Sequence, residues 1–412
     1  DKGTSFEASA LLKNKEFLTS TDAWSRPVNF YVGPDGALYM LDYYRRVIES
    51  PEWMSEQAVK AGGLYDGSDM GRIYRITATS QKSAEWTKGL KLGDESSEKL
   101  VDHLADKNRW WRTNAQRLLV DRNDKKAVPA LLKMAGNLES SMGRLHALWT
   151  LEGIAELSPA LIEQALKDNE AGIRSNAIKL AELHLQESPQ LLKALLTMQN
   201  DNDPKVRLQL LLTLGYDNSK ESATVRNKLL FQDINDKWVQ IAALTASASQ
   251  TESILKEVLN RYQADVPAYS LLVQRLATMI ANGGNQNAIK KLLENSTSNS
   301  SGKQIKGQGA ILEGLATGME SLKSKSPESI NNFKEDQNLL INTFFGHPSV
   351  EVRKGSLDML RVIGLNSSPE TKTAIDKSLK IMADRSLTDQ KRTEAINFLA
   401  LTEPAPYSSL LK

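Results

Sequence analysis

Apolar residues follow two different periods along this chain of 412 residues. Between Trp24 and Ile76 they alternate with polar residues, which is the spacing of β-strands. From about residue 95 onward they recur every three or four positions, which is the spacing of helices. We therefore predict a mainly α-helical chain that carries a small antiparallel β segment near its N-terminus.

The β segment is predicted to be a hairpin followed by a third strand. Residues 26–32 alternate and are rich in β-branched and aromatic side chains, Gly33-Pro-Asp-Gly36 suits a tight turn, and residues 37–43 return as the partner strand. Residues 71–77 follow a Gly-rich loop as the third strand. Because three strands do not bury both of their faces, their apolar side chains are expected either to pack on the first helices or to remain exposed and promote association.

One motif recurs in the helical part: a polar or acidic turn is followed, a few residues later, by an Arg that opens an apolar helix. The arginines of this ladder are Arg112, Arg144, Arg174, Arg207, Arg353 and Arg392. Two degenerate repeats are expected around residues 271–280 and 310–319. The pattern resembles HEAT and armadillo-type repeats. It predicts an α-solenoid wound into a superhelix, in which the turn Asp caps the second helix and the Arg bridges to turn carboxylates of adjacent repeats.

The predicted organisation is a β segment at residues 1–80, a joint at 81–94 and a helical repeat domain at 95–412. Two polar stretches, residues 294–302 and 322–328, are rich in Ser. We expect both to be loops that bound helices of the array.

The β segment also resembles the closing blade of the β-propeller in large bacterial proteins of the membrane-bound dehydrogenase type, relatives of glucose/sorbosone dehydrogenases. The matching residues are Trp24, Arg26-Pro27, Gly33-Pro-Asp-Gly-Ala-Leu-Tyr39, Asp42-Tyr-Tyr-Arg45, Val47-Ile-Glu49, Pro51 and Gly71-Arg-Ile-Tyr-Arg-Ile76. The resemblance implies that this chain is the C-terminal portion of a larger secreted or periplasmic protein, with HEAT-like helices after the propeller. It also implies a parent that uses pyrroloquinoline quinone and calcium in the periplasm or at the cell surface.

Composition narrows the classes of function. The formal net charge of +2 argues against a dedicated nucleic-acid surface, and no apolar run approaches the roughly 18 residues of a membrane helix. The absence of Cys excludes disulfides, a thiol nucleophile, thiolate zinc sites and the Cys-x-x-Cys-His attachment of c-type haem. The cytochrome module that often follows the helices in the similar proteins is therefore missing.

Polar residues beside the strands are the candidates for contacts to a cofactor, because propeller ligands bind among loops and strand ends. They are Arg26, Asp42, Tyr44, Arg45 and Arg72. The alternative is that Arg45 and Arg72 pair with Asp42, Glu49 or Asp69 to hold the strands together.

Other motifs favour structural interpretations. Asp201-Asn-Asp203 begins like a calcium loop, but Pro204 breaks that pattern, so helix capping is favoured. The four histidines lie singly, which disfavours a metal or catalytic site. Trp110-Trp111 can either stack on a ligand or seal the junction between sheet and helices, and the junction is favoured.

These observations predict a non-catalytic scaffold, without catalytic or metal-binding residues, that binds a protein or glycan on its concave helical face. The alternative is part of a quinoprotein-type sugar or alcohol dehydrogenase whose active site lies in other blades. A lyase acting on phycobilin chromophores, as some HEAT-like proteins are, is disfavoured by the absence of Cys and of a clustered acid/base pair.

Overall fold

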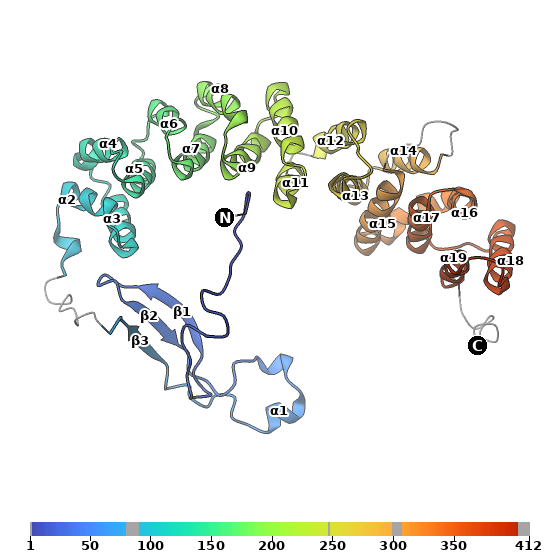
Figure 1. Ribbon diagram of the computed structural model, residues 1–412, viewed down its shortest axis with the longest axis horizontal. Coiled ribbons are helices and arrows are strands. Elements are labelled where there is room, and N and C mark those ends of the chain that lie inside the picture. Colours follow the sequence, from blue (N-terminus) through green and yellow to red (C-terminus); the bar gives the residue numbers. More distant parts are fainter. Residues whose placement is uncertain (1, 80–89, 246–247, 299–306, 403–412) are drawn as a thin grey trace. The chain divides into compact units, whose positions relative to one another are not determined.

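The computed structural model describes residues 2–79, 90–245, 248–298 and 307–402 (Figure 1). The chain forms two compact units, Asp1–Gln209 and Leu210–Lys412. It is mainly α-helical with a small antiparallel sheet in the first unit, which confirms the predicted fold class. In the described ranges, no helix is both long and apolar enough to cross a membrane.

The sheet of the first unit has, in the described part of the chain, three antiparallel strands in the order β1 (Pro27–Val32), β2 (Leu38–Asp42) and β3 (Arg72–Ile76). Tyr31 lies opposite Tyr39, and Met40 lies opposite Tyr74. The hairpin turn closes with the Gly33 N–H donating to the Ala37 carbonyl at 2.9 Å. Gly36 adopts φ 79°, which glycine reaches without strain. The predicted hairpin and third strand are confirmed.

From α2 onward, the helices of the first unit form two layers (Figure 1). They are α1 (Glu56–Lys60) in the β2–β3 connection, then α2 (Ser97–Asp102), α3 (Arg109–Arg122), α4 (Val128–Ala135), α5 (Ser141–Gly153), α6 (Pro159–Ala165), α7 (Ala171–His184), α8 (Pro189–Thr197) and α9 (Pro204–Thr213), the last of which runs into the second unit. Helices α3, α5 and α7 pack in succession in one layer, and α6 and α8 pack in the other. Ser hydroxyls at positions 96, 140 and 158 cap helix starts by accepting backbone N–H groups.

The second unit is helical throughout its described residues. Its helices are α10 (Lys220–Gln232), α11 (Lys237–Ala243), α12 (Ala248–Asn260), α13 (Pro267–Asn282), α14 (Gln286–Thr297), α15 (Gln308–Lys325), α16 (Gln337–Gly346), α17 (Val350–Ile363), α18 (Pro369–Ala383) and α19 (Asp389–Leu399). Helices α13, α15 and α17 pack in succession. Two of them, α13 and α15, occupy the positions where degenerate repeats were expected.

Helix α15 contacts α13 backbone to backbone through glycines. A Cβ atom added to Gly314 would lie 2.3 Å from the carbonyl oxygen of Gln274, and one added to Gly318 would lie 2.4 Å from that of Thr278. The Thr278 hydroxyl donates to the Gly314 carbonyl at 3.1 Å across the same contact. Any larger residue at these two positions would have to push the helices apart.

The prediction that residues 294–302 and 322–328 are loops is wrong for the first described residues of each stretch. Residues 294–297 form the last turn of α14, and residues 322–325 form the last turn of α15. The Thr297 hydroxyl donates to the Leu293 carbonyl at 2.9 Å, so a Ser- and Thr-rich sequence remains compatible with a buried helix end. Residues 299–302 of the first stretch lie outside the described residues.

The predicted joint at 81–94 falls largely on residues 80–89, which also lie outside the described residues. Its last part, Leu92–Asp94, is a single 3₁₀ turn with Leu92 buried. The first unit contains both the sheet and helices of the array. The division into 1–80, 81–94 and 95–412 stays a prediction.

Candidate functional site

The candidate cofactor residues of the sheet are held by contacts within the sheet itself. Asp42 is buried and accepts hydrogen bonds from the N–H groups of Arg26, at 2.7 Å, and Tyr44, at 2.9 Å, and from the Ser25 hydroxyl at 3.0 Å. Burial opposes ionisation of this carboxyl, but these hydrogen bonds outweigh it and keep the pKa of Asp42 below its ordinary value. Asp42 therefore acts as an anchor for the strand end.

The arginines of this group bind backbone carbonyls and aromatic rings. Arg45 donates to the carbonyls of Tyr44 at 2.9 Å and Gly67 at 2.5 Å. The guanidinium of Arg72 lies 4.0 Å from the centre of the Tyr44 ring. Arg26 donates to the Ala23 carbonyl at 2.6 Å. Arg45 and Arg72 thus hold the β2–β3 connection. Their partners are backbone carbonyls and an aromatic ring, whereas the sequence suggested carboxylates. Their role toward a cofactor stays a prediction.

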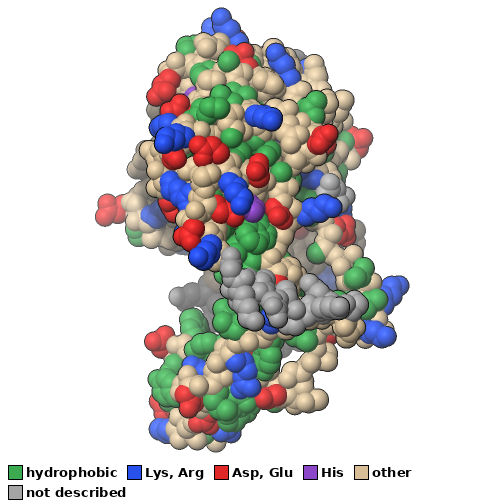
Figure 2. All heavy atoms as spheres, turned by 90° about the vertical axis from the view of Figure 1, so that its left-hand side faces the viewer, with side chains coloured by type: hydrophobic (Ala, Val, Ile, Leu, Met, Phe, Trp, Pro, Cys, Tyr) green, Lys and Arg blue, Asp and Glu red, His purple; other side chains and the backbone are tan. Residues whose placement is uncertain are grey.

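Both faces of the sheet carry exposed apolar side chains. Because side chains alternate along a strand, Phe30 and Val32 lie on one face and Tyr31 and Ile73 on the other. All four are exposed. Figure 2 shows hydrophobic side chains clustered over the sheet, whereas acidic and basic side chains are interspersed over the helices in the same view.

The hairpin turn contacts the first helices through its backbone. The indole N–H of Trp111 donates to the Pro34 carbonyl at 3.0 Å, and the Asn108 amide donates to the Gly33 carbonyl at 2.8 Å. Trp111 also stacks on His103, with ring centres 5.1 Å apart. These contacts favour the junction interpretation of the Trp pair over ligand stacking.

Three arginines of the ladder form bidentate ion pairs with a carboxylate of a later turn or helix. Arg144 binds Asp168 at 2.8 and 3.0 Å, and Arg174 binds Asp201 at 2.7 and 2.8 Å. Arg353 binds Glu394 at 2.9 Å through both oxygens. Burial opposes ionisation of Asp201, but Arg174 outweighs it and holds the pKa of Asp201 below the usual range.

Each of these arginines also donates to a carbonyl in the turn before its own helix. Arg144 and Arg174 thereby join two consecutive turns, whereas Arg353 joins its turn to helix α19. Asp168 and Asp201, which receive the arginines, lie before the capping position. Asp203 caps α9 by accepting the N–H groups of Lys205 and Val206 at 2.8 and 3.2 Å. Capping and pairing are therefore divided between neighbouring residues of one turn.

The remaining ladder arginines also donate to carbonyls of the chain before their own helices. Arg207 donates to the Asp201 carbonyl at 2.8 Å, and Arg392 donates to the Met382 carbonyl at 3.1 Å. Arg112 donates to the Asp106 carbonyl at 2.7 Å and to His146 Nε2 at 3.3 Å. The contribution of the ladder to stability stays a prediction.

Burial and the charge of Arg112 keep His146 in its neutral form. Its Nε2 accepts from Arg112, so the proton lies on Nδ1, which is 2.6 Å from Gln116 Oε1. Burial and the nearby charges of Arg112 and Arg109 lower the pKa of His146 to about 4. Within the described ranges, no three His, Asp or Glu side chains are grouped as a metal site would require.

The first unit should therefore lose stability as pH falls from about 6.5 to about 4. In that window the unfolded chain binds a proton at His146 that the folded chain rejects, so protonation favours unfolding. With the partial exposure discounted, the loss is about 1–2 kcal/mol. Urea unfolding of the wild type and of His146→Gln at pH 7.5 and 4.5 tests this. The variant should show a smaller drop; equal drops would exclude His146 as the titrating group.

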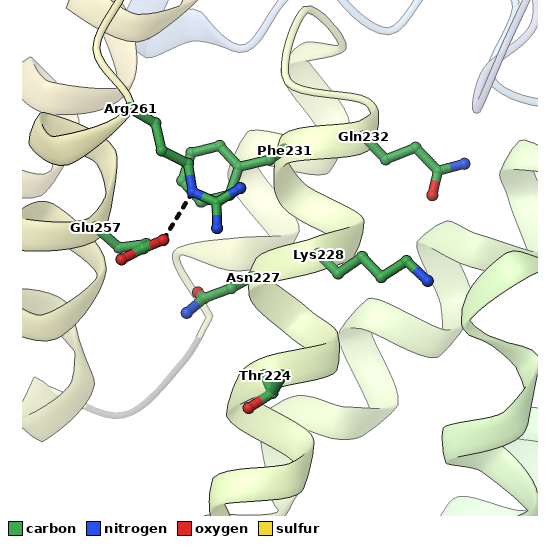
Figure 3. Close-up of a pocket in the computed structure, with 7 residues that line it drawn as sticks. All are labelled: Thr224, Asn227, Lys228, Phe231, Gln232, Glu257 and Arg261. Carbon is green, nitrogen blue, oxygen red and sulfur yellow. Dashed lines mark hydrogen bonds and ion pairs between the residues drawn. The ribbon is translucent and has the colours of Figure 1, made fainter.

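The second unit has a cavity of about 650 Å³ between α10 and α12 (Figure 3). Arg261, just past α12, lies over the ring of Phe231 with its guanidinium 4.4 Å from the ring centre. Its Nε donates to Glu257 at 2.7 Å, which fixes the plane of the guanidinium. Figure 3 shows Lys228 and Gln232 of α10 extending away from Arg261. An oriented guanidinium beside an aromatic ring suits a carboxylate-bearing partner.

Comparison with known proteins adds one family match. A model described as a domain of unknown function (DUF7133) matches residues 1–80, which contain the sheet and none of the helices from α2 onward. No curated protein matches the chain.

Many solved structures match the chain, and two of them illustrate the low TM-scores. One is an engineered protein, with a TM-score of 0.28 and 15% sequence identity. The match covers 74% of this chain and 78% of the engineered protein. The other is a C-terminal fragment of the cohesin loader SCC2 from Chaetomium thermophilum, with a TM-score of 0.23 and 14% identity. That match covers 76% of this chain and 24% of the fragment.

Proposed function

We propose that this chain is a non-catalytic helical-repeat scaffold that binds a macromolecular partner, and that the partner covers the N-terminal sheet. The observation that supports this most is the apolar surface on both faces of the sheet. Phe30 is 46% exposed on one face, and Ile73 is 67% exposed on the other. Burying such surface against a partner stabilises a complex by roughly 25 cal/mol per Å² of apolar area.

The helices extend the same role. Helices α5 and α7 pack side by side, and the Trp149 indole N–H of α5 donates to Asn176 of α7 at 3.0 Å. A layer of successive helices repeats its exposed face once per repeat, which suits an extended protein or glycan partner.

The proposal predicts association through the sheet. The wild-type chain should self-associate as its concentration rises and should bind a hydrophobic dye, because its sheet has no covering partner. The double variant Phe30→Lys/Ile73→Lys should do neither, since both positions are exposed and the fold is retained. Sedimentation velocity and dye fluorescence measure the two effects.

A matched control replaces exposed apolar residues outside the sheet, one in the α4–α5 turn and one on α7: Leu138→Lys and Leu183→Lys, which are 78% and 58% exposed. This control should associate as the wild type does. A wild-type chain that remains monomeric and binds no dye would contradict the proposed role of the sheet. Limited proteolysis adds a check, because rapid loss of residues 2–79 would show that the junction at Trp111 does not hold the sheet.

A second candidate is a periplasmic or cell-surface dehydrogenase of the quinoprotein type, in which this sheet is one blade of a propeller. The two exposed apolar faces of the sheet favour this candidate, because each blade of a propeller packs between two adjacent blades. The polar atoms of Asp42 and Arg45 are already used inside the sheet, so no residue of this chain is assigned to pyrroloquinoline quinone or calcium.

Calorimetric titration of the quinone, calcium and a sugar panel distinguishes the two candidates. It should be run on this chain and on a longer protein that joins the segment to further blades. Saturable binding by the longer protein alone would support the dehydrogenase. Binding by neither would reject it and leave the scaffold.

A further inference from the structure

A second cavity of the second unit combines an aromatic floor with a cationic rim. Its volume is about 430 Å³, and helices α16, α17, α18 and α19 all contribute to its lining. Phe344 and Phe345 form the floor, with ring centres 4.9 Å apart, and the fully buried Phe398 supports them from below at 5.3 Å from each ring. Apolar side chains of Ile381 and Leu387 line the cavity as well.

The rim is positively charged because its single carboxylate is already neutralised. Both oxygens of Glu394 accept from Arg353 at 2.9 Å, in a pair whose side chains are 23% and 15% exposed. Lys377 and Lys391 also line the cavity. The ammonium of Lys377 lies 4.5 Å from the centre of the Phe345 ring. Among the described residues, neither lysine forms an ion pair.

We propose that this cavity binds an acidic peptide segment of a partner, with one apolar side chain on the aromatic floor and flanking carboxylates on Lys377 and Lys391. This proposal rests on the scaffold function above and assigns to it a site separate from the sheet. The floor supplies the buried apolar anchor that concentrates binding energy in protein interfaces. The two lysines lie on different helices. Their positive charge selects a negatively charged partner and accelerates its association.

A segment of chain fits this arrangement better than an isolated anion does. A small anion pairs only with the lysines and leaves the apolar floor in water. A peptide delivers an apolar side chain and two carboxylates together. The conformational entropy that the peptide loses on binding is then offset by several contacts at once, which is the usual basis of peptide recognition.

The test uses the full chain with isotope-labelled Ile and Leu methyl groups. The probe is an acetylated and amidated pentapeptide with leucine at its centre and two glutamates on each side. Titration should give saturable shifts of the Ile381 and Leu387 methyl signals. Changing the four glutamates to lysines, or the central leucine to serine, should weaken binding by about tenfold or more.

Charge reversal on the protein provides the matched comparison. Lys377→Glu/Lys391→Glu should lose binding by about tenfold or more. The control Lys372→Glu/Lys380→Glu changes the net charge equally on an exposed face of α18 and should bind as the wild type does. Equal losses in both variants, equal shifts with inorganic phosphate, or no shift at Ile381 and Leu387 would each overturn the proposal. The sheet variants above leave this cavity unchanged, so the two proposals fail independently.

Discussion

Gly314→Ala is expected to destabilise the second unit by about 2–4 kcal/mol. The added Cβ would lie 2.3 Å from the Gln274 carbonyl oxygen, a backbone atom that no rotamer change can move. The intrinsic helix propensity of Ala offsets about 1 kcal/mol of this cost. Urea unfolding gives the stability, and hydrogen exchange should show faster opening of α13 and α15.

Gly346→Ala is the matched control, because the same Cβ at Gly346 meets no atom within 4 Å. It should change stability by less than about 0.5 kcal/mol. If both variants unfold at the same urea concentration, helices α13 and α15 do not meet at this glycine.

Arg144→Met should destabilise the first unit by about 3 kcal/mol. The substitution keeps the apolar stem, but it leaves Asp168 as a nearly buried carboxylate without its bidentate partner. It also removes one of the two donors to the Asn137 carbonyl. Arg117→Met removes an exposed pair with Asp121, whose side chains are 63% and 61% exposed, and should cost less than about 0.5 kcal/mol. Denaturant unfolding of the two variants measures the difference.

The double variant Arg144→Met/Asp168→Asn isolates the pair itself. It should recover part of the loss, because the uncompensated charge is removed. Arg174→Ala should loosen the neighbouring repeats in the same way, since Asp201 is equally enclosed. An Arg144 variant no less stable than the Arg117 variant would remove the stabilising role of the ladder.

Local patterns predicted much of the fold. Alternation around Gly33-Pro-Asp-Gly36 identified the hairpin because the turn and both strands lie within one short segment. The spacing of the ladder indicated successive helix pairs because each Arg opens its own helix. The end of α14 was missed because Ser and Thr favour loops by composition, although their hydroxyls also bond to carbonyls of their own helix.

The two cavities were not predictable in this way. Phe231 and Arg261 are separated along the chain by helices α11 and α12, and Lys377 meets Phe345 from a different helix. No periodicity relates such residues, because their proximity depends on how helices pack rather than on spacing along the chain. The same limit applies to Arg45, whose carbonyl partners at Gly67 and Ser68 belong to a loop of irregular backbone.

The glycine contact of α15 has a mechanical consequence. Repulsion between backbone atoms rises steeply with compression, whereas an Arg–Asp pair is attached through several rotatable bonds that yield to small displacements. Where α13 and α15 meet at Gly314 and Gly318, the array is stiff, and where Arg144 and Arg174 join repeats it is compliant. Local bending is therefore easier at the turns that Arg144 and Arg174 join than at the glycine contact between α13 and α15.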